Sequence, residues 1–300
     1  MHFLRRAVPL GLPSVLLVAC LAVAPPAFAQ AVTPASPPAG TPSARAPLPE
    51  QIELNLIDLP TTLSVQRHRS YFRLTHRFAR DLRRGDLGEL ASDLFSLDNG
   101  SIIGLEYRFG ITASLQAGVH RSMLSKTIQT FARWDAIAQD RSPVAASLTV
   151  SVEGLNNLRQ KRQPAVALTV SRVFGDVAAF YATPALVGRT KAVDFIAGHE
   201  DHIGELGEPD EHSNHNETWL LGLGTRVRFS RTVYVVGEYT PRLAGYDPNA
   251  GTWGVAIEKR TGGHTLQLNF TNSFGTTFGQ LARGGSPHDI YLGFNITRKF

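Results

Sequence analysis

The feature that most constrains the fold is a set of twelve segments in which apolar and polar residues alternate. In Gly104–Phe109, for example, every second residue is apolar, and Glu106 and Arg108 fall between them. A period of two residues is typical of a β-strand with one apolar and one polar face, and the helical period is absent. The segments, each about the length of a tilted membrane-spanning strand, are Tyr71–Ala79, Ser101–Phe109, Ala113–His120, Lys126–Ile137, Val144–Glu153, Ala165–Phe174, Val177–Val187, Thr218–Phe229, Thr232–Arg242, Thr252–Lys259, His264–Thr271 and Asp289–Phe300.

The connections between these segments alternate in length. Short turns follow the second, sixth and eighth segments, and long loops follow the first, fifth, seventh, ninth and eleventh; the long loops are Arg80–Gly100, Gly154–Pro164, Gly188–Glu217, Leu243–Gly251 and Asn272–His288. Long outer loops and short periplasmic turns are typical of outer-membrane barrels. We therefore predict an all-β protein, a transmembrane antiparallel up-and-down β-barrel of about 12 strands. The alternative is a secreted soluble β-sandwich or barrel.

The first residues predict export. Two arginines precede an apolar run, and Ala27-Phe28-Ala29 provides a cleavage site, so residues 1–29 read as a signal peptide. Leu17–Cys20 also resembles a lipoprotein processing site with Cys20 as the lipidated residue, although the apolar run continues beyond it. Because Cys20 is the only cysteine, the mature chain is expected to contain neither a disulfide nor a thiolate metal site.

Residues 30–60 are predicted to form a Pro/Ala-rich periplasmic linker, and residues 61–300 the barrel. The stretch QIELNLIDLPTTLSVQ at residues 51–66 is more apolar than the rest of the linker. Two placements are open for it: a short strand, or a segment lodged at or inside the periplasmic mouth of the barrel.

Overall composition is compatible with a barrel in a membrane. Mean hydropathy is −0.08, and alternation of lipid-facing and lumen-facing residues averages hydropathy to near zero. The 30 basic and 25 acidic residues form no run of like charge that would indicate a nucleic-acid partner.

The chain ends on an aromatic residue preceded by alternating apolar positions. Phe294, Ile296 and Phe300 are predicted to form the signal that the barrel-assembly machinery reads on the last strand. Arg298 departs from this pattern, at an interfacial position where an arginine costs only about 0–1 kcal/mol. The predicted location is the outer membrane of a Gram-negative bacterium, with its lipid as a partner.

Several motifs resemble a bacterial family of β-barrel proteins that is catalogued as a domain of unknown function. They are RLTHRF (73–78), LFSLDNG (94–100), GLEYRFG (104–110), GVHRS (118–122), GGHTLQLNFTNS (262–273) and DIYLGFNITRKF (289–300). The resemblance runs from about Thr62 to Phe300. It implies an outer-membrane-type barrel and no established activity, so no catalytic residue is carried over.

Charged residues fall on the predicted inward face. The lumen candidates are Glu106, Arg108, Arg133, Arg226, Arg228 and Glu238, and Arg73, Arg77, Asp135, Glu153 and Glu258 share this face. Two interpretations are open. The acidic and basic residues pair with one another across a narrow interior, or they line a polar constriction for a small charged solute, in which Arg226 and Arg228 attract anions.

A second group is predicted to gather at the extracellular rim: His76, Arg77, Asp98, Asn99, His120 and Arg121. A histidine beside a carboxylate suits acid–base chemistry. No serine with a plausible oxyanion partner accompanies them, so we predict that the protein is not an enzyme, and hydrogen-bonded rim residues are the alternative.

The loop after the seventh segment is rich in histidine and acidic residues. His199, His202, His212 and His215, with the surrounding carboxylates, suit a divalent ion such as zinc, copper or nickel. The alternative is a solvated acidic loop that binds nothing specific.

The predicted function is passage or capture of a small solute at the cell surface. The alternative is a non-conducting barrel that binds a divalent metal or a partner through its extracellular loops. A lipid-directed enzyme is the third reading.

Overall fold

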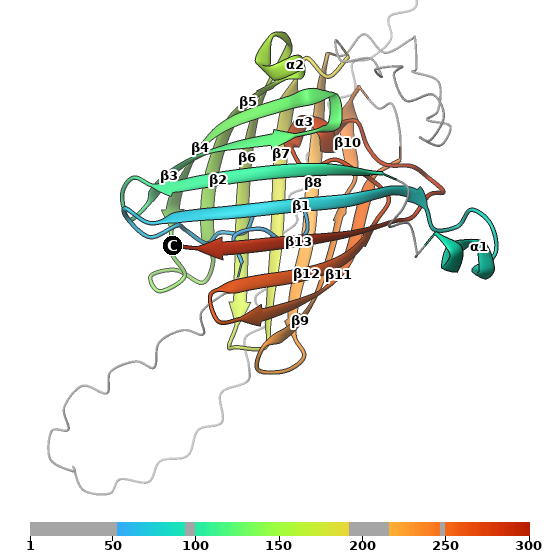
Figure 1. Cartoon of the computed structure of the whole chain (residues 1–300). Helices are drawn as coiled ribbons and strands as arrows, with labels where there is room; N and C mark the ends of the chain where they lie inside the picture. The colour runs from blue at the N-terminus through green and yellow to red at the C-terminus, as the bar shows by residue number, and fades with distance from the viewer. Residues whose placement is uncertain (1–52, 94–99, 192–215, 247–249) are drawn as a thin grey trace, which may run out of the picture. The chain divides into compact units, whose positions relative to one another are not determined.

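A computed structural model describes residues 53–93, 100–191, 216–246 and 250–300. It is a closed antiparallel barrel of 12 strands with one extra short strand and little helix, as predicted (Figure 1). The strands are β1 (Ser70–Asp81), β2 (Ser101–Gly110), β3 (Leu115–Ser122), β4 (Thr127–Ile137), β5 (Ala145–Gly154), β6 (Gln160–Phe174), β7 (Ala178–Gly188), β8 (Glu217–Arg228), β9 (Val233–Thr240), β10 (Arg242–Gly245), β11 (Thr252–Thr261), β12 (His264–Thr271) and β13 (Tyr291–Lys299).

The short helical pieces are α1 (Leu87–Ser92), η1 (Leu124–Lys126), α2 (Leu155–Leu158) and α3 (Phe278–Ala282). Among the described residues, no helix is long and apolar enough to cross a membrane. The predicted signal peptide and the linker up to residue 52 lie outside the described residues.

The barrel closes between its first and last strands. β13 pairs with β1 in antiparallel register, with Leu74 opposite Ile296. The amide of Phe300 donates to the Ser70 carbonyl at 2.9 Å and extends this pairing to the end of the chain. Figure 1 shows β1 in blue beside β13 in red. Closure pairs the outer edges of the first and last strands with each other, which is what a sheet in lipid requires.

Two connections differ from the predicted boundaries. The predicted strand Thr232–Arg242 is interrupted at Pro241, which has no N–H to donate. β9 and β10 continue on either side of it along β8, and the Pro241 carbonyl accepts from the Leu221 amide at 3.1 Å. β6 begins at Gln160, so residues 155–159 replace the longer predicted loop Gly154–Pro164.

The outward face of the barrel is an apolar band. Leu105, Val150 and Leu268 are 44%, 46% and 48% exposed, whereas their neighbours Glu106, Ser151 and Gln267 are buried inside. The alternation read from the sequence therefore places apolar side chains outside and polar side chains inside. This is the distribution that a barrel surrounded by lipid requires.

The interior of the barrel is filled rather than open. Residues 53–61, which we call the inner segment, lie inside it and are almost fully buried. The first eight of them fall in the predicted linker, and of the two open placements for this stretch the structure has the one inside the barrel. Leu56, Ile57 and Leu59 pack against α3 and against small residues of the wall: Ala165 and Ala167 on β6, Ala179 and Ala185 on β7, and Ala256 on β11.

The apolar band predicts how the barrel responds to a buried charge. Leu268→Arg, in the middle of β12, should lower the free energy of unfolding in lipid vesicles by about 2–4 kcal/mol, because the guanidinium would face hydrocarbon. The matched control is Val177→Arg in the β6–β7 turn, where the cost should be about 0–1 kcal/mol. Urea titration followed by heat-modifiable migration measures both, and equal effects would contradict the assignment of the band.

Candidate functional site in the barrel lumen

The inner segment folds back on itself as a tight turn. The Leu56 amide donates to the Leu59 carbonyl at 2.8 Å, and the Thr61 amide donates to the Leu54 carbonyl at 2.9 Å. These bonds satisfy part of the backbone, and several of the other N–H and C=O groups bond to side chains of the barrel wall. Buried backbone groups of this kind need partners, and the wall provides them.

On one side of the turn, the N–H groups converge on a single carboxylate. Glu238 of β9 accepts from the amides of Ile57, Asp58 and Leu59 at 3.0, 3.0 and 3.2 Å. Consecutive backbone N–H groups that point to one place form a concave anion-binding site. Here the carboxylate of Glu238 comes from the wall, and the N–H donors come from the inner segment.

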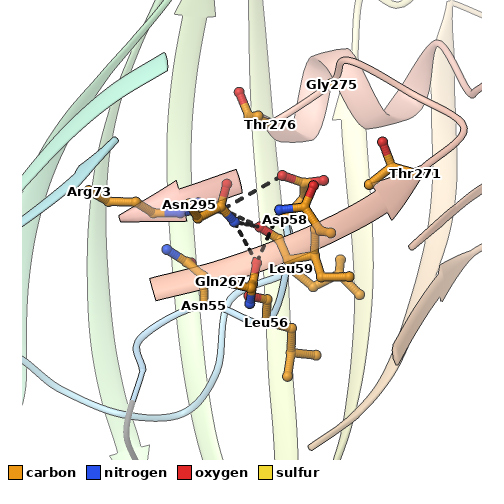
Figure 2. Close-up of polar contacts among 12 residues, drawn as sticks. Asn55, Leu56, Asp58, Leu59, Arg73, Gln267, Thr271, Gly275, Thr276 and Asn295 are labelled. Atoms are coloured by element: carbon orange, nitrogen blue, oxygen red, sulfur yellow. Dashed lines mark hydrogen bonds and ion pairs between the residues drawn. The ribbon is translucent and has the colours of Figure 1, made fainter. Parts of the chain in front are cut away.

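On the other side, side chains of the wall donate to the carbonyl groups of the turn. Arg226 of β8 donates to the Asn55 carbonyl at 2.7 Å. Gln267 of β12 donates to the Leu56 carbonyl at 2.9 Å, and Asn295 of β13 to the Ile57 carbonyl at 3.2 Å. Figure 2 shows the turn with Gln267, Asn295 and Arg73 around it. Strands far apart in the sequence therefore hold one turn in place.

Asp58, at the tip of the turn, neutralises two buried arginines of β1. Its carboxylate lies 2.9 Å from Arg77 and 3.6 Å from Arg73, and all three side chains are at most 4% exposed. Arg77 also donates to Asn295 Oδ1 at 2.8 Å. A buried arginine is costly without a carboxylate partner. Among the described residues, Asp58 is the only acid that forms an ion pair with Arg77.

Several other lumen charges pair with one another. Arg226 lies 3.1 Å from Glu258, and Arg133 lies 2.8 Å from Asp135. Glu106 pairs with Arg108 and lies 3.4 Å from His120 Nδ1. This is the self-satisfying arrangement that was one of the two interpretations of the inward charges, and it extends to the inner segment.

The opposite side of the lumen is closed by α3 and the residues before it. The Gly279 amide donates to Glu153 of β5 at 3.0 Å, and the Thr276 hydroxyl lies 2.9 Å from His120 Nε2. Phe278 and Leu281 join the apolar cluster around the inner segment. The loop between β12 and β13 therefore folds into the barrel and forms a second layer over the inner segment.

The described residues enclose a small cavity and a larger vestibule around these layers. A cavity of about 40 Å³ lies between the inner segment and α3, and Arg108, Arg133, Gln129 and Thr149 contribute to its polar lining. A vestibule of about 1000 Å³ lies at the end of the barrel where β1 begins and β13 ends, lined by residues 62–66 and 135–142. The vestibule reaches Leu54 of the inner segment.

The structure places five of the six lumen candidates around this network. Glu106, Arg108, Arg133 and Arg226 are buried, and Glu238 binds the turn. Arg228 lies instead at the end of β8 and pairs with Asp176 in the β6–β7 turn. The essential partner Asp58 was missing from the sequence-based set, although the apolar stretch around it was a signal that this region is buried.

The rim candidates separate. Arg77 and His120 lie inside the lumen rather than at the rim, because β1 continues to Asp81, β3 continues to Ser122, and both side chains occupy inward positions. His76 points outward and stacks on Phe294, with ring centroids 4.7 Å apart. Arg121 donates to the backbone of Ser122. Asp98 and Asn99 lie outside the described residues.

Two further sets stay predictions. Phe294 and Ile296 lie on β13, and Phe300 is 54% exposed with the Arg298 guanidinium 5.0 Å from its ring centre, but their reading by an assembly machinery is untested. The metal candidates His199, His202, His212 and His215 lie outside the described residues. In the described part of the chain, no group of three or more histidine, cysteine or acidic side chains is placed to hold a metal ion.

Comparison with known families decides the class of this barrel. The family model described as "Membrane bound beta barrel domain (DUF5777)" matches residues 53–300. The chain belongs to this family. The resemblance identified from the motifs is thereby confirmed, and the protein is a membrane-bound β-barrel. The match to the DUF5777 domain begins at residue 53, so it includes the inner segment as well as the strands.

No curated protein matches the sequence significantly. Solved outer-membrane barrels are similar in fold to this DUF5777 chain. The KdgM porin has a TM-score of 0.45 and 10% identity over 77% of this chain and 99% of its own. An outer membrane channel from Pseudomonas putida F1 has a TM-score of 0.44 and 11% identity, covering 79% and 97%. The Acinetobacter baumannii protein Omp33 has a TM-score of 0.40 and 9% identity, covering 79% and 100%. Similarity at this level carries no information on a solute.

The clamp on the turn makes a testable prediction about local stability. Glu238→Gln should speed hydrogen exchange at the amides of Ile57, Asp58 and Leu59 by roughly ten- to a hundredfold. The reason is that a single amide oxygen accepts hydrogen bonds more weakly than the two oxygens of a carboxyl group, which should weaken these bonds by about 1.4–2.8 kcal/mol. The matched control is Glu153→Gln, which should speed exchange at Gly279 and leave the turn unchanged. If both variants affect the turn equally, the clamp is not local.

Proposed function

We propose that this protein is a gated channel for a small solute in the outer membrane of a Gram-negative bacterium. In the closed state the inner segment and α3 fill the lumen, and the channel opens when they leave it. The solute then passes along the polar inner wall between the cell surface and the periplasm.

The observation that carries this proposal is that the barrel closes without the inner segment. Every strand of the 12-strand ladder pairs with two neighbouring strands, and the closing pair β1–β13 uses no residue of the inner segment or of α3. Among the described residues, the inner segment bonds to side chains of the wall and pairs with no strand of the barrel, and residues 62–69 join it to β1. It is therefore able to move without breaking the backbone pairing of the barrel.

The size and chemistry of the wall support the same proposal. Eight-stranded barrels are filled by their own side chains, and barrels of 16–18 strands hold an aqueous channel. A 12-stranded barrel lies between these, so its lumen has room for a small solute once a separate segment leaves. The wall is polar over β1–β5, β12 and β13. The vestibule of about 1000 Å³ leads from one end of the barrel to the inner segment.

Planar-bilayer conductance tests the proposal. The wild-type protein should show rare and short openings. Replacement of residues 53–61 by a Gly/Ser sequence of equal length should lengthen the openings at least tenfold, and a further Gly/Ser replacement of residues 276–283 should increase the conductance of the open state. The matched control is an equal Gly/Ser replacement of residues 40–48, which should behave like the wild type.

Heat-modifiable migration and a β-sheet circular dichroism spectrum verify that each variant is folded. If the folded double replacement does not conduct, the channel proposal is wrong. The barrel would then act through its extracellular loops, as a non-conducting binding protein.

A further inference from the structure

We propose that the turn of the inner segment occupies a solute-binding site in the lumen, and that the solute is a short acidic peptide or a similarly acylated acidic amino acid. Such a solute carries a carboxylate, N–H donors and an aliphatic group. The proposal rests on the channel function proposed above and names its solute class. It follows from the hydrogen-bond, ion-pair and packing partners that each part of the wall loses when the turn leaves.

The first part of the site is a carboxylate pocket. Arg73 and Arg77 point inward from β1 and are almost fully buried, and Asn295 lies against Arg77. Gly293 of β13 gives Arg77 its room, because a Cβ there would meet the Arg77 side chain. When Asp58 leaves, Arg73 keeps Glu106 of β2 at 3.9 Å, whereas Arg77 keeps no ion pair among the described residues. A carboxylate of a solute would restore the charge-assisted bonds that Asp58 made.

The second part is an acceptor for N–H groups. Glu238 lies on β9 between Gly224 of β8 and Gly254 of β11 in the sheet register. Its carboxylate accepts three N–H groups of the turn. Once the turn leaves, this carboxylate needs new donors. A bare anion would be repelled by it, whereas a solute with amide N–H groups satisfies it.

The third part is a set of three hollows for aliphatic side chains. Gly222 and Gly224 of β8 face inward, and a Cβ at either position would collide with Leu59 or Leu56. Gly254 makes room for Ile57 in the same way. The wall is thus shaped for aliphatic groups on one side and for a carboxylate on the other. This combination matches a peptide rather than an inorganic anion.

Binding and opening are coupled in this arrangement. The solute and the turn of the inner segment compete for the same arginines and the same glutamate, so both cannot be bound at once. A solute that binds only when the turn has left shifts the population toward the open channel. In the closed state, the turn of the inner segment therefore occupies the site for which the solute competes.

Binding of a labelled peptide tests the site. The probe is acetyl-Asn-Leu-Ile-Asp-Leu-Pro-amide, the sequence of residues 55–60, added to the variant with residues 53–61 replaced and followed by fluorescence anisotropy in detergent. We expect saturable binding, weakened at least tenfold when the peptide carries Asn in place of Asp. Acetyl-Asp-Leu-amide should displace the label, and acetyl-Asn-Leu-amide should not.

Substitutions in the wall assign the contacts. Arg77→Gln should weaken the Asp peptide at least tenfold and change the Asn peptide little, and Gly224→Val should weaken both peptides. The matched control is Arg172→Gln on the outer face of β6, which should change neither. Equal binding of the Asp and Asn peptides, or equal effects of the two arginine substitutions, would overturn the site.

The outcome is distinguishable from failure of the channel, because anisotropy does not depend on conduction. If the replacement variant binds the peptide but does not conduct, the channel proposal is wrong and the binding site is supported. If it conducts but does not bind the peptide, the binding-site proposal is wrong. If the replacement variant does not fold, Asp58→Asn in the full chain takes its place. The Asp peptide should then speed hydrogen exchange at Ile57–Leu59, and no change on adding it would overturn the proposal.

Discussion

The interaction on which the lumen depends is the ion pair of Asp58 with Arg77 and Arg73. A barrel with an apolar outer face turns its polar residues inward, and charged residues placed there must find partners in a space with little water. Among the described residues, no carboxylate of the wall forms an ion pair with Arg77. The inner segment brings one, and the position of its turn follows from this pairing.

Once Asp58 is placed, the rest of the turn is determined by complementary groups of the wall. Glu238 satisfies its N–H groups, and Gln267 and Asn295 satisfy its carbonyls. The glycines on β8 admit its aliphatic side chains. The lumen has a charged sector and an apolar sector, and the inner segment contacts both. Side chains of the wall hold the inner segment at many points, but no strand of the described barrel pairs with it. A molecule that competes for the same side chains is therefore able to displace it and end the closed state.

Much of the barrel was predictable because its signals are local. Alternation along one strand states which residues face outward, and this placed Leu105 outside and Glu106 and Arg226 inside. Errors arose where the answer depended on other strands. Arg77 and His120 were predicted at the rim because each lies near the end of its strand pattern, whereas β1 extends to Asp81 and β3 to Ser122. Pro241 interrupts a strand whose pattern continues through it.

The sequence by itself determined the strands, their inward and outward faces and the membrane-barrel class, since each follows from a period of two and from loop lengths. Only the tertiary structure decided that the lumen is filled, and by which residues. Asp58 and Arg77 are 19 positions apart, and Ile57 and Glu238 are 181 apart. No local pattern links them, because they are brought together by the closed barrel, in which the inner segment occupies the lumen.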